Sequence, residues 1–153
     1  MKIAMLGHKR IPSREGGVEI VVGEIATRMA KMGHEVVCYN RSRRGIDKIK
    51  EYNGVKIKYV FTIDLRGVAA MTSSLFGSLK AAFGKHEVVH YHAEGPAAMC
   101  FLPKLFGKKI VVTIHGLDWQ RDKWEVLLQN TFSLAKRWQP SMQMKLLCFR
   151  KML

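Results

Sequence analysis

The stretch MKIAMLGHKRIPSREGGVEIVVGEIATRMAKMGHEVVCYN, residues 1–40, decides the fold. Residues 2–6 form a short apolar run, which is typical of a buried strand, and residues 8–17 are rich in turn-forming and charged residues. Across residues 18–32, apolar side chains recur every three or four positions, which predicts an amphipathic helix. Residues 35–39 resemble a second strand. The stretch therefore predicts a β-loop-α-β unit.

The same alternation continues through most of the chain. Further strands are expected at residues 55–61, 87–91 and 109–114, and further helices at 68–83 and 95–106. Strands that alternate with helices favour parallel pairing, because each helix carries the chain back across the sheet. We expect an α/β fold with a Rossmann-like, doubly wound and mainly parallel sheet.

The segment 125–153 has a different composition. It contains no glycine, one acidic residue and five basic residues, and the alternation of strand and helix is lost. A terminal helix or a disordered tail is expected here. We therefore divide the chain into a domain over residues 1–124 and an atypical tail over 125–153.

Composition places the chain among single-domain proteins with a strong basic excess. A length of 153 residues and a hydrophobic content of 48% suffice for one buried core. The net charge of +14 attracts phosphate-bearing partners such as nucleic acid, anionic lipid or phosphorylated sugars, but charge alone does not choose among them. The start has no secretory signal pattern, and no apolar run approaches 20 residues.

The cysteines indicate neither a disulfide framework nor a zinc site. Cys38, Cys100 and Cys148 are odd in number, lie far apart and form no C-x-x-C pair. A reducing cytoplasm suits this usage best.

Three groups of residues fall where a parallel sheet binds ligands, beyond the carboxyl ends of its strands. Gly16 and Gly17 precede the first helix, whose free N–H groups and dipole suit a diphosphate, although two glycines also simply make a tight turn. His115 follows the last predicted strand and is able to bind a sugar hydroxyl or assist proton transfer. His90 and His92 share one face of their strand, but the spacing supplies no further metal ligands.

Other phosphate-binding motifs are absent. Neither the P-loop pattern G-x-x-x-x-G-K-[ST] nor the dinucleotide fingerprint G-x-G-x-x-G occurs. An arginine at position 41 follows the second strand where an NAD enzyme has an acidic residue, which leaves an NADP-dependent reductase as an alternative. A basic nucleic-acid-binding protein is a second alternative, although no nucleic-acid-binding motif accompanies the charge.

Four stretches carry a resemblance to a known family. They are MKIAMLGHKRIPSREGGVE, EVVCYNRS, VVHYHAEGPA and KIVVTIHGLDWQRDKW, all within residues 1–124. Together they resemble the N-terminal region of bacterial, rhamnosyltransferase-like glycosyltransferases. The resemblance implies the N-terminal, acceptor-side half of a GT-B fold, in an enzyme that retains the anomeric configuration and needs neither metal nor cofactor.

The resemblance also implies site roles. Gly16 and Gly17 would approach the diphosphate of a nucleotide-sugar donor, and His115 would act at the reacting centre. The acceptor, a saccharide or a polyprenyl-diphosphate-linked saccharide, would meet His92, Glu94, Asp118, Trp119 and Arg121. The enzyme would act in polysaccharide or cell-envelope glycan synthesis in the cytoplasm, with peripheral contact to an anionic membrane and no nucleic-acid partner.

The tail has its own explanation. Codons permitted for residues 125–153, read with a shift of one base, spell a sequence that resembles the continuation of this family. We therefore expect a frameshifted, truncated product that is inactive alone, because the donor-binding half is missing. Deleting residues 126–153 is then expected to change thermal stability little.

Overall fold

The chain forms one mainly parallel sheet with helices on both faces. The computed structural model describes residues 1–65, 68–92, 97–115 and 144–149. Within this part of the chain the strand order is β3-β4-β2-β1-β5-β6-β7, and only β3 pairs antiparallel. The expected α/β, Rossmann-like, doubly wound sheet is confirmed. The elements in chain order are β1 (Lys2–Leu6), α1 (Gly17–Lys31), β2 (Glu35–Arg41), β3 (Glu51–Tyr52), β4 (Val55–Val60), α2 (Val68–Phe83), β5 (Val88–His92), α4 (Phe101–Leu105), β6 (Lys109–His115) and β7 (Met144–Phe149).

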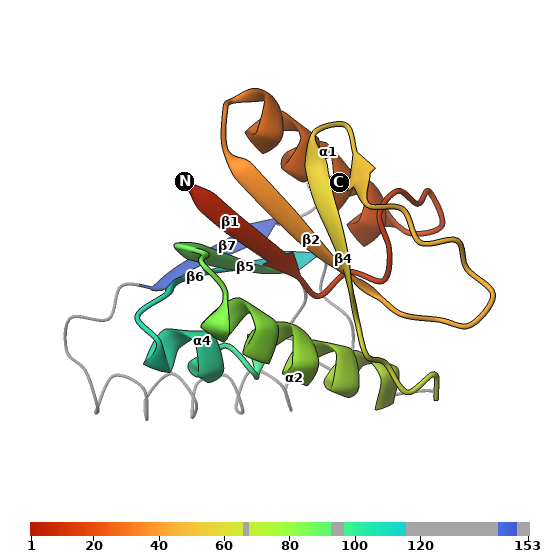
Figure 1. Cartoon of the computed structure of the whole chain (residues 1–153). Coiled ribbons are helices and arrows are strands. Elements are labelled where there is room, and N and C mark those ends of the chain that lie inside the picture. Colours follow the sequence, from red (N-terminus) through yellow and green to blue (C-terminus); the bar gives the residue numbers. More distant parts are fainter. Residues whose placement is uncertain (66–67, 93–96, 116–143, 150–153) are drawn as a thin grey trace.

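The sheet separates two buried clusters. Helix α1 covers one face, and α2 and α4 cover the other (Figure 1). Along β1 the side chains alternate between these faces. Ile3 and Met5 belong to the cluster that contains Val22 of α1, whereas Ala4 and Leu6 belong to the cluster on the α2 side. This burial on both faces explains why β1 is apolar at consecutive positions.

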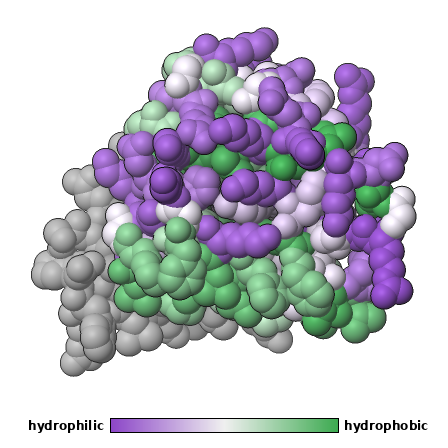
Figure 2. All heavy atoms as spheres, viewed as in Figure 1, coloured by the Kyte–Doolittle hydropathy of each residue, from purple (hydrophilic) through white to green (hydrophobic). Residues whose placement is uncertain are grey.

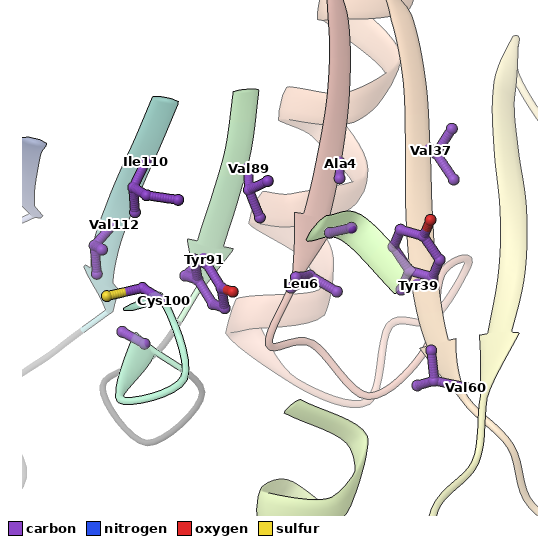
Figure 3. Close-up of a cluster of buried hydrophobic side chains, with 12 residues drawn as sticks. Ala4, Leu6, Val37, Tyr39, Val60, Val89, Tyr91, Cys100, Ile110 and Val112 are labelled. Carbon is purple, nitrogen blue, oxygen red and sulfur yellow. The ribbon is translucent and has the colours of Figure 1, made fainter. Parts of the chain in front are cut away.

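Two tyrosines carry hydroxyl groups into the α2-side cluster (Figure 3). The Tyr91 hydroxyl lies 2.6 Å from Oγ of Ser78, and the Tyr39 hydroxyl lies 3.0 Å from Nε2 of His86. Each buried hydroxyl therefore has a hydrogen-bond partner, which offsets its loss of water.

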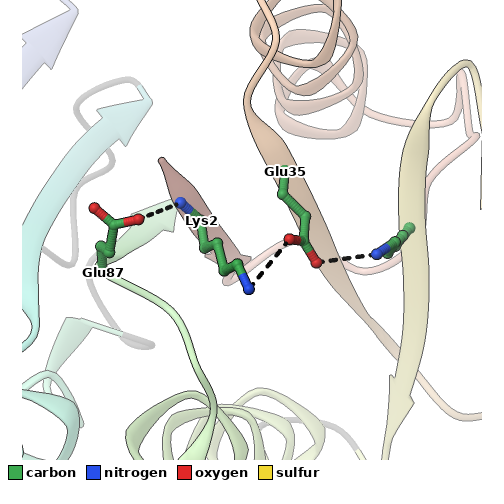
Figure 4. A network of polar contacts seen from close by, with 4 residues as sticks. Lys2, Glu35 and Glu87 are labelled. Carbon is green, nitrogen blue, oxygen red and sulfur yellow. Dashed lines mark hydrogen bonds and ion pairs between the residues drawn. The ribbon is translucent and has the colours of Figure 1, made fainter.

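Ion pairs join the strands at the amino-terminal edge of the sheet (Figure 4). The Glu35 carboxylate lies 3.6 Å from Nζ of Lys2 and accepts a hydrogen bond from Nζ of Lys56 at 3.0 Å. The backbone N–H of Lys2 donates to Oε1 of Glu87 at 3.0 Å. Lys56 holds the pKa of Glu35 below its ordinary value. These groups are solvent-exposed, so we assign them a minor role in stability.

Two elements differ from the sequence-based expectation. The short strand β3 was not predicted; it pairs with β4 through a turn at Asn53 and Gly54, both with positive φ. An Asn-Gly pair between strands is a known hairpin signal and would have revealed it. The helix predicted over 95–106 is described only as α4, Phe101–Leu105.

The expectation of a terminal helix or disordered tail is wrong for residues 144–149. They form β7, which pairs parallel to β6 from Ile110 opposite Met144 to His115 opposite Phe149. An apolar run beside an open strand edge gains backbone hydrogen bonds by joining the sheet. The remaining tail positions lie outside the described residues.

None of the helices in the described ranges has the length and apolar character that crossing a bilayer requires.

Candidate functional site

The candidate site lies where the direction of the sheet reverses. From β1 the chain adds β2 and β4 on one side and then β5 and β6 on the other. The loops that leave the carboxyl ends of β1 and β5 therefore run in opposite directions. Open parallel sheets bind ligands at the place where this happens, which is called the switch point of the sheet.

Gly7 brings the ends of β1 and β5 into contact. Its φ is +101°, and an added Cβ would collide with the carbonyl group of His92. A side chain at position 7 would be strained and would have no room. The close approach places the residues after β1 against the end of β5.

Three histidines from β5 and β6 pack together at this edge. Nδ1 of His92 lies 3.1 Å from Nε2 of His115, and the two ring planes are 23° apart. The His90 ring lies 4.0 Å from that of His92, centroid to centroid, and its Nε2 lies 2.7 Å from Oγ1 of Thr113. His92 is fully buried, whereas His115 is half-buried. The sequence had placed His90 and His92 on one face, and this is confirmed.

His8, directly after Gly7, acts electrostatically on His92 and contacts Asn40. Nε2 of His8 lies 3.0 Å from Oδ1 of Asn40. The Ile11 N–H donates to the same oxygen, and Nδ2 of Asn40 donates to the Ile11 carbonyl. Both bonds fix the orientation of the amide, so Nε2 of His8 is the donor and Nδ1 is unprotonated. This Nδ1 and Nε2 of His92 are buried without a hydrogen-bond partner in the described part of the chain.

The imidazoles of this cluster are neutral at physiological pH. Burial lowers the pKa of His8 and that of His90 to about 4. Burial, followed by the neighbouring His90 and His8, lowers the pKa of His92 well below its ordinary range. The pKa of His115 is lowered by burial, and the carboxylate of Glu19 partly opposes this. A neutral imidazole both donates and accepts a hydrogen bond, which suits contact with a sugar hydroxyl.

The glycine pair lies at the start of α1, on the same edge of the sheet. Gly16 is the N-cap, and a Cβ there would collide with the carboxylate of Glu19. Glu19 is buried, and its Oε1 accepts the N–H of Lys9 at 3.1 Å. Gly16 therefore has a structural reason to be glycine. No atom comes within 4 Å of a Cβ built on Gly17, so the first turn of α1 is open on that side.

The structure describes four of the predicted site residues. Gly16, Gly17, His92 and His115 all lie at the carboxyl-terminal edge. The others, Glu94, Asp118, Trp119 and Arg121, lie outside the described residues. Sequence reasoning did not assign a role to His8 or Asn40, and the only available signal was that each stands at or just after the end of a strand.

Metal-ligating side chains do not converge in the part of the chain described. No group of three or more His, Cys, Asp or Glu side chains there is arranged to hold a metal ion. Cys38 and Cys100 are both buried and free.

The strand order and the helices on both faces define a Rossmann-like α/β domain. Residues 15–145 match the family model for Glycosyltransferase Family 4, and the chain belongs to this family. Its fold is that of the N-terminal domain of a GT-B glycosyltransferase.

Solved structures agree with this fold. Sucrose-phosphate synthase from Thermosynechococcus elongatus is similar, with a TM-score of 0.63 and 14% sequence identity. The match covers 95% of this chain and 47% of that chain, so the chain spans about half the length of that structure. A search of curated proteins finds no match.

Proposed function

We propose that this chain is the acceptor-side domain of a retaining, rhamnosyltransferase-like hexosyltransferase. The enzyme would move a sugar from a nucleotide-sugar donor to a saccharide acceptor in polysaccharide or cell-envelope glycan synthesis. The observation that carries the proposal is the bond between His92 and His115 at the switch point of the sheet, beside the open start of α1.

His115 is proposed to act at the reacting centre. The contact with His92 uses its Nε2, and a hydroxyl of the transferred sugar would meet Nδ1 of the same ring. A neutral imidazole held in one orientation helps to position the sugar without prior reorganisation. Gly16 and Gly17 would let the donor diphosphate approach the N–H groups of α1 from across the cleft.

The acceptor would be met by Glu94, Asp118, Trp119 and Arg121, whereas His92, for which the resemblance implied the same role, is buried beneath His115. Full burial makes His92 a positioning residue in our proposal, acting through His115 rather than on the acceptor directly. The other four roles rest on the family motif.

A polyprenyl-diphosphate-linked acceptor would bring the enzyme to the cytoplasmic face of a membrane. An apolar surface runs along α2 and α4 beneath a hydrophilic upper half (Figure 2). Exposed apolar side chains beside basic charge favour peripheral contact with anionic lipid. The exposed apolar residues on this surface are Met71, Leu75, Phe76, Phe83, Phe101, Leu105 and Phe106.

The alternatives rank lower. An NADP-dependent reductase and a nucleic-acid-binding protein were both compatible with the sequence, but the family match favours sugar transfer over either. The shifted reading frame proposed for residues 125–153 stays a prediction, and the nucleotide sequence of the gene tests it.

The test joins this chain to a donor-binding domain of the same family and measures sugar transfer from labelled nucleotide sugars. His115→Ala and Gly17→Trp, the second at the open glycine, should each lower kcat at least about a hundredfold, because positioning and charge stabilisation supply much of the rate. The control His34→Ala lies in the turn after α1 and should retain activity. Full activity of both site variants would disprove these roles. Residues 1–153 alone should transfer no sugar, because half a cleft holds no donor.

A further inference from the structure

A hollow of about 470 Å³ lies on the other side of β1 from the histidine cluster. It is bounded by residues that follow the carboxyl ends of β1, β2 and β4, and by the first turn of α2. These strand ends lie side by side above the start of α2 (Figure 1). No role has been assigned to this hollow so far.

Cations line the hollow, and the Nε atom of one of them has no hydrogen-bond partner among the residues described. Arg43 is neutralised by Asp64, whose Oδ2 lies 2.8 Å from its Nε. Arg41 is half-buried, and its Nε is enclosed without a hydrogen-bond partner among the residues described. Burial lowers the pKa of Arg41, and the carboxylates of Glu19 and Asp64 compensate only in part. An anion bound here would satisfy the guanidinium.

Two further cations stand at the same wall. Lys9 and Arg10 follow β1, and the backbone of Arg41 is tied to them because its N–H donates to the Lys9 carbonyl at 2.8 Å. Of the acidic lining residues, Glu15 is exposed and Glu19 already accepts the Lys9 N–H. The lining contains four cations and three carboxylates: Lys9, Arg10, Arg41 and Arg43 against Glu15, Glu19 and Asp64.

The hollow extends toward a second one of about 790 Å³. The two share Arg43, Ile46, Thr62 and Asp64, and the second adds Arg44 and Lys48 to the lining. Along this second hollow, Arg43, Arg44 and Lys48 outnumber the carboxylate of Asp64, which suits an extended ligand that carries more than one negative charge.

One carboxylate is common to the hollow and to the surroundings of His115. Glu19 lines the hollow and at the same time acts electrostatically on His115. A ligand anchored by its anionic group at Arg41 would therefore lie near the carboxylate that also acts on His115.

We propose that Arg41, with Lys9 and Arg10, forms an anion subsite that binds the phosphate or diphosphate of the acceptor. The identity of the ligand as the acceptor rests on the proposed function, whereas anion binding itself does not. Guanidinium groups bind phosphate oxygens through paired, charge-assisted hydrogen bonds, which makes arginine suited to this role. The subsite selects acceptors that carry phosphate over neutral saccharides.

The experiment titrates the full chain by calorimetry with inorganic pyrophosphate, a hexose 6-phosphate, geranyl diphosphate and uridine diphosphate. Pyrophosphate and at least one of the two esters should bind, and Arg41→Gln should weaken that binding about tenfold or more. Whichever ester binds better identifies a soluble phosphosugar or a prenyl diphosphate as the acceptor class.

Two variants make the test specific. Arg28→Gln removes the same charge from an exposed position in the last turn of α1 and should change binding less than twofold. Ala70→Asp places a carboxylate in the lining at the first turn of α2, where an acidic residue is compatible with the helix, and should abolish binding. Thermal unfolding confirms that each variant is folded.

Three results would overturn the subsite. The first is an equal loss of binding affinity in Arg41→Gln and Arg28→Gln. The second is unchanged binding by folded Ala70→Asp, and the third is that no probe binds to the full chain. If Arg41→Gln weakened the binding of uridine diphosphate alone, the assignment of the subsite to the acceptor would be wrong. Because no step requires sugar transfer, failure of the proposed function leaves these results interpretable.

Discussion

His92 and His115 stand at the ends of neighbouring parallel strands, with Nδ1 of the first 3.1 Å from Nε2 of the second. One ring is fully buried and the other half-buried. The hydrogen bond between these two nitrogens contains one proton. If Nδ1 of His92 and Nε2 of His115 were both protonated, two N–H groups would face each other and repel. The stability of this arrangement therefore depends on the imidazoles of His8, His90, His92 and His115 remaining neutral.

We expect stability to fall as the pH drops from about 6.5 to about 4. The folded-state pKa values of His8 and His90 are about 4, below the ordinary value of 6.5. In this window the unfolded chain binds more protons, so the stabilisation is complete above about 6.5 and is lost as the pH falls toward 4. Each histidine contributes up to about 1.4 kcal/mol per pH unit. Urea unfolding at pH 7, 6 and 5 measures this slope.

The variant His8→Gln separates one contribution from the rest. The glutamine amide N–H still donates toward Oδ1 of Asn40 but does not titrate. The slope of unfolding free energy against pH should therefore decrease by the amount that corresponds to about one bound proton. An unaltered slope in His8→Gln would mean that His8 is not held neutral by the fold.

The contact between β1 and β5 depends on the glycine at position 7. Gly7→Ala should lower the free energy of unfolding by about 3 kcal/mol or more, because positive φ and a collision with the His92 carbonyl act together. Gly33→Ala shares the positive φ, at +84°, but meets no atom within 4 Å, and should cost about 1 kcal/mol. Equal losses in the two variants would show that the close approach contributes nothing.

The buried hydroxyl pair under α2 should behave as a unit. Tyr91→Phe leaves the Ser78 hydroxyl without its 2.6 Å partner, and Ser78→Ala does the same to Tyr91, so each should cost about 1–3 kcal/mol. The double variant should cost less than the sum by at least about 0.5 kcal/mol, because the second change removes the stranded group. Denaturant unfolding of the unsubstituted protein, the two single variants and the double variant gives the coupling energy between Tyr91 and Ser78. Strictly additive losses would show that the two hydroxyl groups are not coupled.

Elements with strong local signals were predicted from the sequence. The apolar run at β1 and the helical periodicity of α1 are each contained within a single stretch of sequence. The parallel pairing of the strands was predicted from the alternation of strands and helices. β7 was missed because its stability comes from pairing with β6, 34 residues earlier, and nothing in its own composition signals that partner. The Asn53-Gly54 turn was a usable local signal that went unread.

The site was predictable only in outline. His115 and His92 stand at strand ends, which a sequence reveals, so their placement at one edge was expected. The burial of His8 was not, because a histidine in a polar loop carries no sign that Gly7 will draw its backbone against β5. The unpartnered Nε of Arg41 likewise depends on three strand ends meeting in space.

The last prediction concerns β7 and reverses the expectation drawn from composition alone. Deleting residues 144–153 removes all six register pairs between β6 and β7 and leaves β6 as an exposed edge. With about 1 kcal/mol of net stability per backbone hydrogen bond, the loss should reach about 2 kcal/mol or more. Deleting only 150–153 keeps every one of those pairs and should cost far less. Urea unfolding of both deletions decides the matter: equal stability in the two would show that β7 adds nothing, and that residues 144–149 behave as the passive tail first expected.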